Sequence, residues 1–190
     1  MEKIQEDKLR ILKAFNIDEP ITAIEPFGNG HINDTLKVTN AQGETKYVLQ
    51  KINHHIFTNV EMLQNNIQVV TSHIREKLAA QGVTDLDRKV LTFLPTREGK
   101  SYFFDGESYW RLCLFIPRSK SYEEVTPELA YEAGKAFGDF QSMLADLPEN
   151  ALGETIPNFH NMAFRLEQFR EAVKANSAGR LEEVNELVDE

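Results

Sequence analysis

A short stretch with two glycines has the composition of a loop that covers phosphate. From Gly28 to Thr35 it reads Gly-Asn-Gly-His-Ile-Asn-Asp-Thr, and extended segments are predicted on either side of it. Because glycine has no Cβ, backbone N–H groups in such a loop can approach phosphate oxygens closely. The stretch lacks the Gly-Lys-Ser/Thr of a Walker loop, and no helix is predicted directly after its glycines, as a dinucleotide-binding fingerprint would require. A phosphate-covering loop and a plain hairpin turn are the two interpretations left open.

Lys51 is the second residue whose position suggests a phosphate ligand. It ends the sequence Val-Leu-Gln-Lys on the third predicted strand, after a strand, the glycine loop and another strand. Protein kinases place their phosphate-gripping lysine on this strand and their glycine-rich loop between the first two strands. Side chains alternate along a strand, so Leu49 and Lys51 share a face, where Leu49 could cover a base and Lys51 could reach phosphate. The alternative is an ordinary solvated lysine.

The end of the most strand-like segment offers backbone groups to an adenine ring. This segment, 109–116, ends in Leu114, Phe115 and Ile116 just before Pro117. A kinase linker presents one carbonyl and one N–H group to the base, and Pro117 has no N–H group. The workable pair is therefore the Leu114 carbonyl and the Ile116 N–H, although the edge strand of any sheet would look similar.

These candidate residues need a sheet and a long helix to position them. The hydrophobic pattern predicts a long helix with Asn59 as its N-cap and Gly82 as the residue that ends it. The predicted fold class is α+β, with a five-stranded, mostly antiparallel sheet and one inserted helix, followed by further helices. The sequence is divided into a nucleotide-binding lobe, 1–117, and a linker with an incomplete helical lobe, 118–190. Extended segments are predicted at 21–24, 32–39, 46–52, 90–94, 101–104 and 109–116, and the other helices at 8–16, 127–147, 161–174 and 179–188.

Composition narrows the classes of protein and partner. The chain has 190 residues, 41% of them hydrophobic, and a net charge of −9. This acidic balance argues against nucleic acid as a partner, because binding a phosphate backbone needs a basic face, whereas a small nucleotide needs only a few local donors. The single cysteine, Cys113, excludes an intrachain disulfide and a cysteine-based zinc site, and it fits a reducing, cytoplasmic compartment. No apolar run approaches the roughly 20 residues of a membrane span, so no membrane partner is predicted.

Four strings of the sequence resemble the N-acetylhexosamine 1-kinases. They are the glycine stretch 28–35, Tyr-Val-Leu-Gln-Lys-Ile-Asn at 47–53, Trp110-Arg111 before Phe115-Ile116, and Ile-Pro-Asn-Phe-His-Asn at 156–161. That family belongs to the aminoglycoside phosphotransferase and choline kinase group, whose fold is two-lobed and protein-kinase-like. The resemblance implies transfer of the ATP γ-phosphate, with Mg²⁺, to the anomeric hydroxyl of an N-acetylhexosamine.

The residues and the resemblance together assign roles within a predicted site. Lys51 would grip the phosphates. His31 would lie near phosphate or sugar, and His160 and Asn161 are further candidates for the sugar site, with helix capping as the alternative role of Asn161. The predicted nucleotide site comprises Gly28, Asn29, Gly30, His31, Asn33, Leu49, Leu114, Phe115 and Ile116.

The sequence also departs from this family's pattern. It contains no His-x-Asp with a downstream Asn, so the catalytic loop and the magnesium ligands are expected in a part of the enzyme that this chain lacks. The chain alone is therefore predicted to bind nucleotide weakly and to be inactive, and none of its own residues is predicted to bind metal. The long helix offers amides such as Gln64 where a kinase has the glutamate that pairs with its lysine.

Three further expectations stay open. The substrate could be another small alcohol, as in kinases of aminoglycosides, choline or homoserine. The chain could also be a non-catalytic nucleotide-binding or regulatory module. A half-built helical lobe would leave apolar helix faces uncovered, which favours a homo-oligomer.

Overall fold

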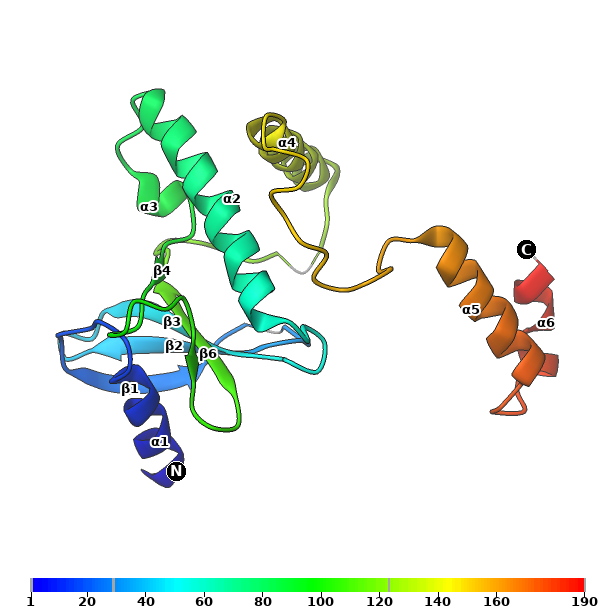
Figure 1. Cartoon of the computed structure of the whole chain (residues 1–190), viewed down its shortest axis with the longest axis horizontal. Helices are drawn as coiled ribbons and strands as arrows, with labels where there is room; N and C mark the ends of the chain where they lie inside the picture. Colours follow the sequence, from blue (N-terminus) through cyan, green and yellow to red (C-terminus); the bar gives the residue numbers. More distant parts are fainter. Residues whose placement is uncertain (1, 29, 123, 190) are drawn as a thin grey trace. The chain divides into compact units, whose positions relative to one another are not determined.

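The structure is a computed structural model that describes residues 2–28, 30–122 and 124–189. The chain forms two compact units, Met1–Thr155 and Ile156–Glu190. The first unit holds a β-sheet and four helices, and the second holds two helices (Figure 1). The predicted division after residue 117 stays a prediction about lobes, because the compact units part at residue 155 instead.

The sheet is antiparallel throughout and confirms the α+β class. Its strand order is β1-β2-β3-β6-β4, and the short strand β5 pairs with one end of β6 outside this path. The segment predicted to be extended at 101–104 forms β5, which the turn at Asp105-Gly106, with Gly106 at a φ of 104°, folds back onto β6. The predicted total of five strands is therefore one too few. The strands are β1 (Ile21–Pro26), β2 (Asp34–Asn40), β3 (Thr45–Ile52), β4 (Phe93–Leu94), β5 (Phe103–Phe104) and β6 (Tyr109–Leu114).

One face of the sheet packs against helix α1 (Glu2–Leu12) and forms the main core. Leu36, Leu49 and Leu112 lie opposite one another on β2, β3 and β6, so their side chains share this face. The core cluster joins them to Leu12 and to Phe15, which is 0% exposed. We call this side of the sheet the α1 face.

The opposite face carries a different set of side chains. Thr35, Gln50 and Arg111 lie opposite one another on the same three strands, one position away from the leucines. Helix α2 (Val60–Ala80) lies on this side, since Ile67 and Val70 line one cavity together with Arg111. We call this side the α2 face, and Figure 1 shows α1 and α2 on opposite sides of the sheet.

Helix α2 begins and ends where the sequence predicts. The Asn59 side chain accepts a hydrogen bond from the Met62 N–H at 2.9 Å, which satisfies one of the free donors of the first turn. Gly82 follows the helix with a φ of +81°, a left-handed conformation that favours glycine. The four-residue helix α3 (Leu86–Lys89) was not predicted, because a single turn has no apolar period to reveal it.

Helix α4 (Pro127–Leu144) is tied to α2 by polar contacts. The Asp146 carboxylate accepts from Lys77 Nζ at 2.5 Å and lies 2.9 Å from His73 Nε2. Asn66 exchanges two hydrogen bonds with the backbone of Gly153, at 2.7 and 2.9 Å. These contacts explain why α4 and the segment after it belong to the first unit rather than to the second.

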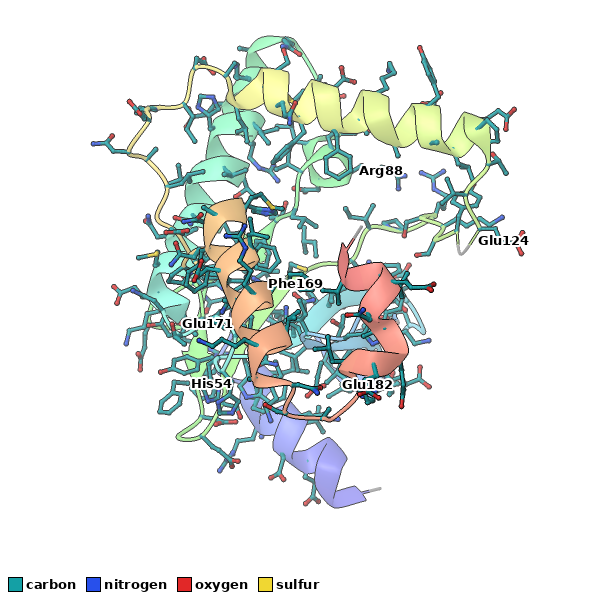
Figure 2. All side chains as sticks on the ribbon, turned by 90° about the vertical axis from the view of Figure 1, so that its right-hand side faces the viewer. His54, Arg88, Glu124, Phe169, Glu171 and Glu182 are labelled. Carbon is teal, nitrogen blue, oxygen red and sulfur yellow. The ribbon has the colours of Figure 1, made fainter. Side chains whose placement is uncertain are left out.

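The second unit consists of α5 (Met162–Ala175) and α6 (Leu181–Asp189). Figure 2 shows its side chains, with Phe169 and Glu171 labelled on α5 and Glu182 on α6. Within the part of the chain that the structure describes, no helix is long and apolar enough to cross a membrane. Self-association through uncovered helix faces stays a prediction.

Candidate functional site

The glycine loop joins β1 to β2 and lies over the α2 face at its start. The Phe27 N–H donates to the Thr35 carbonyl at 2.9 Å, which places Phe27 opposite Thr35 and its ring on the α2 face. Gly28 has a φ of +79°, and neither Gly28 nor Gly30 has any atom within 4 Å of the place where a Cβ would stand. The backbone is therefore open to a ligand at both glycines. Asn29, also predicted here, lies outside the described residues.

The loop meets the start of the linker through two aromatic rings. The centroids of Phe27 and Phe115 are 5.7 Å apart with the rings edge to face, although the residues are far apart in the sequence. Phe115 lies on the α2 face because its N–H group donates to the Lys46 carbonyl at 2.8 Å, continuing the ladder between β3 and β6. The structure thus brings together the predicted phosphate loop and the predicted adenine-binding segment.

The end of β6 and the linker after it are held by one backbone and two side-chain hydrogen bonds. The Leu114 N–H donates to the Thr92 carbonyl at 2.9 Å, so the peptide groups of Leu114 point toward β4. Arg88, labelled in Figure 2, donates from Nη1 to the Pro117 carbonyl at 2.6 Å. The Ile116 carbonyl accepts from the Ser119 hydroxyl at 3.0 Å. The hydrogen bonds of Leu114 and Ile116 to adenine stay a prediction.

The register corrects the prediction for Leu49 and bears on Lys51. Both side chains do share a face, but it is the α1 face, and Leu49 is 0% exposed within the core. Leu49 is therefore unable to cover a base. Lys51 lies opposite Asp34 on one side and Trp110 on the other, so it projects from the sheet face opposite to Phe27 and Phe115.

Lys51 and His31 line a polar cavity of about 540 Å³ beyond the end of β3. The cavity is also lined by Asp34, His54 and Glu107. Figure 2 labels His54. Asn33 has a structural contact, since its Oδ1 accepts from the Asn53 N–H at 2.9 Å and ties the glycine loop to the segment after β3.

A row of polar side chains crosses the α2 face, and the sequence did not reveal it. The Gln50 Nε2 donates to the Thr35 hydroxyl at 3.0 Å, and the Arg111 Nε donates to the Gln50 Oε1 at 2.9 Å. The Arg111 guanidinium also lies over the Phe93 ring, 5.4 Å from its centroid. An arginine inside the most apolar strand was the signal that could have pointed to this row.

Asp105 organises the turn beside Lys51. Its carboxylate accepts from the backbone N–H groups of Glu107 and Ser108 at 2.9 and 2.7 Å, and from Trp110 Nε1 at 2.7 Å. Burial alone would raise the pKa of this carboxyl, but the three donors and the nearby Lys51 ammonium outweigh it and hold the pKa below its usual value. The turn therefore depends on the ionised form of Asp105.

We expect the Asp105→Ala variant to lose about 1–3 kcal/mol of unfolding free energy near neutral pH, because three donors lose their acceptor. The carboxyl has a lower pKa in the folded chain than in the unfolded chain. Its stabilisation is therefore present above the unfolded pKa and is lost as the pH falls through the folded pKa. Urea unfolding at a series of pH values checks this, and the gap between wild type and variant should narrow below about pH 4.

The matched control for this variant is Asp85→Ala. Asp85 is an exposed aspartate at the N-cap of α3, and its side chain makes no capping hydrogen bond. We expect that control to stay within about 0.5 kcal/mol of wild type. A gap for Asp105→Ala that does not change with pH would contradict the assignment.

The predicted sugar-site residues His160 and Asn161 lie in the second unit. The Asn161 Oδ1 accepts from the Phe164 N–H at 3.1 Å, so Asn161 is the N-cap of α5. The exposed His160 ring packs edge to face on Phe159, with the centroids 4.7 Å apart. A role in sugar binding stays a prediction for both residues.

Two further observations bear on the chemistry. Among the residues that the structure describes, no three His, Cys, Asp or Glu side chains gather as they would to hold a metal ion. Burial raises the pKa of the Cys113 thiol to about 11, so this cysteine is protonated and unreactive at neutral pH. The sequence matches no model of a known protein family.

Proposed function

We propose that this chain is the nucleotide-binding part of an ATP-dependent phosphotransferase, with an N-acetylhexosamine as the phosphate acceptor. The observation that carries the proposal is the contact between Phe27 and Phe115. It joins the glycine loop to the linker on one face of the sheet, and these are the two segments that hold the phosphates and the base in a kinase-like site. The choice of acceptor rests on the resemblance of the sequence to N-acetylhexosamine 1-kinases.

The order of the elements supports the proposal. An antiparallel sheet with a glycine loop between its first two strands and a long helix after the third is compatible with the small lobe that the resemblance implies. In the proposed enzyme the last strand of the lobe, β6, leads through the linker to the helical lobe, which begins with α4. The left-handed φ of Gly28 would suit a plain hairpin as well, so it is the aromatic contact between Phe27 and the linker that favours a phosphate loop.

Each part of the site has a physical task in this proposal. Backbone N–H groups near Gly28 and Gly30 approach the phosphates, because no Cβ stands in the way. The rings of Phe27 and Phe115 offer apolar and edge contacts to the purine. Mg²⁺ neutralises phosphate charge when it is bound with ATP, and the described residues do not form a site for it, so we assign no step to the metal.

Binding of Mg·ATP by the full chain tests the proposal. We expect isothermal titration calorimetry to detect binding, and we expect Phe115→Ala to weaken it about 5- to 10-fold, because an aromatic contact contributes about 0.5–1.5 kcal/mol beyond its buried area. Phe104→Ala is the matched control, since Phe104 is 47% exposed on β5 and lies outside the proposed site. Absence of binding to wild type at millimolar ATP, or equal weakening by both variants, would contradict the proposal.

A further inference from the structure

Two side chains between α2 and the sheet have buried polar atoms without partners. They are Gln64, at both Oε1 and Nε2, and Arg111, at Nη1. Within the described ranges, 2–28, 30–122 and 124–189, every buried side-chain nitrogen or oxygen without a hydrogen-bond partner belongs to one of these two residues. Buried polar atoms are nearly always paired in folded proteins, so two such groups in one layer call for a functional explanation.

Arg111 carries a positive charge that nothing nearby balances. Its contacts are the neutral Gln50 amide and the Phe93 ring, and the described part of the chain gives it no carboxylate partner. Burial lowers the pKa of the guanidinium, and the Cys113 thiol, which is protonated at neutral pH, supplies no counter-charge. A buried cation without a counter-charge is costly, which is expected where the protein keeps it for an anionic ligand.

The position of Arg111 suits the phosphates of the proposed nucleotide. Val48 and Cys113 lie opposite each other on β3 and β6, and the next pair on the same face is Gln50 and Arg111. Phe115 is four residues from Arg111 on β6, about 13 Å along the strand, and the row of Arg111 and Gln50 ends at Thr35, which lies opposite Phe27 at the start of the glycine loop. Gln50 accepts a hydrogen bond from the guanidinium Nε, and Gln50 is itself held by its hydrogen bond to the Thr35 hydroxyl.

Gln64 lies on the stripe of α2 that faces this row. It is 1% exposed, and at helical spacing it falls in line with Val60, Ile67 and Ile74. A kinase has a charged glutamate in the middle of this helix to pair with the phosphate-binding lysine. A neutral amide leaves the Arg111 charge unpaired, and it can itself donate to a phosphate oxygen.

We propose that Arg111, oriented by Gln50 and Thr35, is the side chain that binds the nucleotide phosphates, in place of Lys51. This inference rests on the proposed function. Arginine suits the role, because its planar fork binds two phosphate oxygens at once. Since Nη1 is buried in the free chain and α2 residues line the cavity that Arg111 lines, phosphate binding requires α2 to move outward, and this movement would also bring Gln64 within reach of the ligand.

Calorimetry with Mg·ATP and with adenosine shows whether Arg111 or Lys51 binds the phosphates. For the full chain we expect Arg111→Met to weaken Mg·ATP binding about ten-fold or more and to change adenosine binding less than about two-fold. Lys51→Met, the matched control on the α1 face, should leave both affinities within about two-fold of wild type. A loss of ATP binding in Lys51→Met but not in Arg111→Met would overturn the inference while leaving the proposed function intact. Wild type that binds neither ligand would instead contradict the proposed function.

Circular dichroism and thermal melting will show whether Arg111→Met folds. If it does not fold, two further measurements test the inference. Arg111→Lys keeps the charge but loses the fork, and we expect it to bind Mg·ATP about 3- to 10-fold more weakly than wild type. In wild type labelled with ¹⁵N-arginine, the Arg111 Nε–H resonance, protected by its bond to Gln50, should shift when inorganic tripolyphosphate is added. An unshifted resonance would overturn the inference without any substitution.

Discussion

Replacing Phe15 with alanine is expected to lower the unfolding free energy by about 3–5 kcal/mol, the usual cost of removing a large buried aromatic side chain. Phe15 is 0% exposed and is the largest fully buried side chain among the described residues. It lies just after α1 and packs into the cluster formed with Leu49 and Leu112 of the sheet. Small domains have an unfolding free energy of only about 5–15 kcal/mol, so the cavity left by this substitution would remove a large part of it.

Urea unfolding followed by the fluorescence of Trp110 measures this loss. Trp110 is the only tryptophan of the chain and belongs to the same core cluster, so its emission reports directly on the α1 face. Phe104→Ala, with its side chain 47% exposed, is the size-matched control and should change stability by less than about 1 kcal/mol. Equal costs for the two variants would mean that α1 does not pack on this face of the sheet.

The local structure could be read from the sequence because its signals are local. The helix that begins after Asn59 combines a capping side chain, a continuous apolar stripe and a terminal glycine, and each of these acts within a few residues. The hairpin of β2 and β3 has the same character, since a glycine turn joins two segments rich in strand-forming residues. The glycine loop and the linker were likewise found from short strings.

The sidedness of the sheet could not be predicted in this way. Alternation shows that Leu49 and Lys51 share a face, but it does not show which helix covers that face. Here the apolar side of α1 and Phe15 cover it, which buries Leu49 in the core and leaves Lys51 at its margin. Because neighbouring residues of β3 point to opposite faces, the α2 face carries Gln50 and not Lys51. The side chain that binds phosphate is therefore expected on the face of Gln50.

The polar row depends on contacts that are distant in the sequence. Gln50 and Arg111 are separated by 61 residues, and their hydrogen bond exists only because β6 inserts between β3 and β4. Taken alone, Gln50 is an ordinary polar residue on a strand. Arg111 became significant only once the structure showed that a buried guanidinium nitrogen has no partner.

The Gln50→Glu variant is expected to become more stable and to lose ATP binding at the same time. The Gln50 Oε1 already accepts from the Arg111 Nε at 2.9 Å, so a carboxylate at this position would pair with the guanidinium with little rearrangement. The Thr35 hydroxyl, 3.0 Å from Gln50 Nε2, can reverse its role and donate to the new oxygen. A hydrogen bond to a charged group contributes more than one between neutral groups, and we expect a net gain of about 1–2 kcal/mol in unfolding free energy.

The same carboxylate would pair with the Arg111 guanidinium that phosphate needs, and its negative charge would repel phosphate. We therefore expect Mg·ATP binding to weaken about 100-fold, or about 2.7 kcal/mol, while adenosine binding changes less than about two-fold. Thermal melting and calorimetry on one preparation measure both effects, with Lys51→Glu as the control that adds a carboxylate on the opposite face. A variant that is stabilised but binds Mg·ATP normally would show that the Arg111 charge is paired for folding and not kept for phosphate. The opposite signs of the two effects distinguish a ligand-binding arginine from a structural one, because a purely structural arginine would gain a partner at no cost to binding.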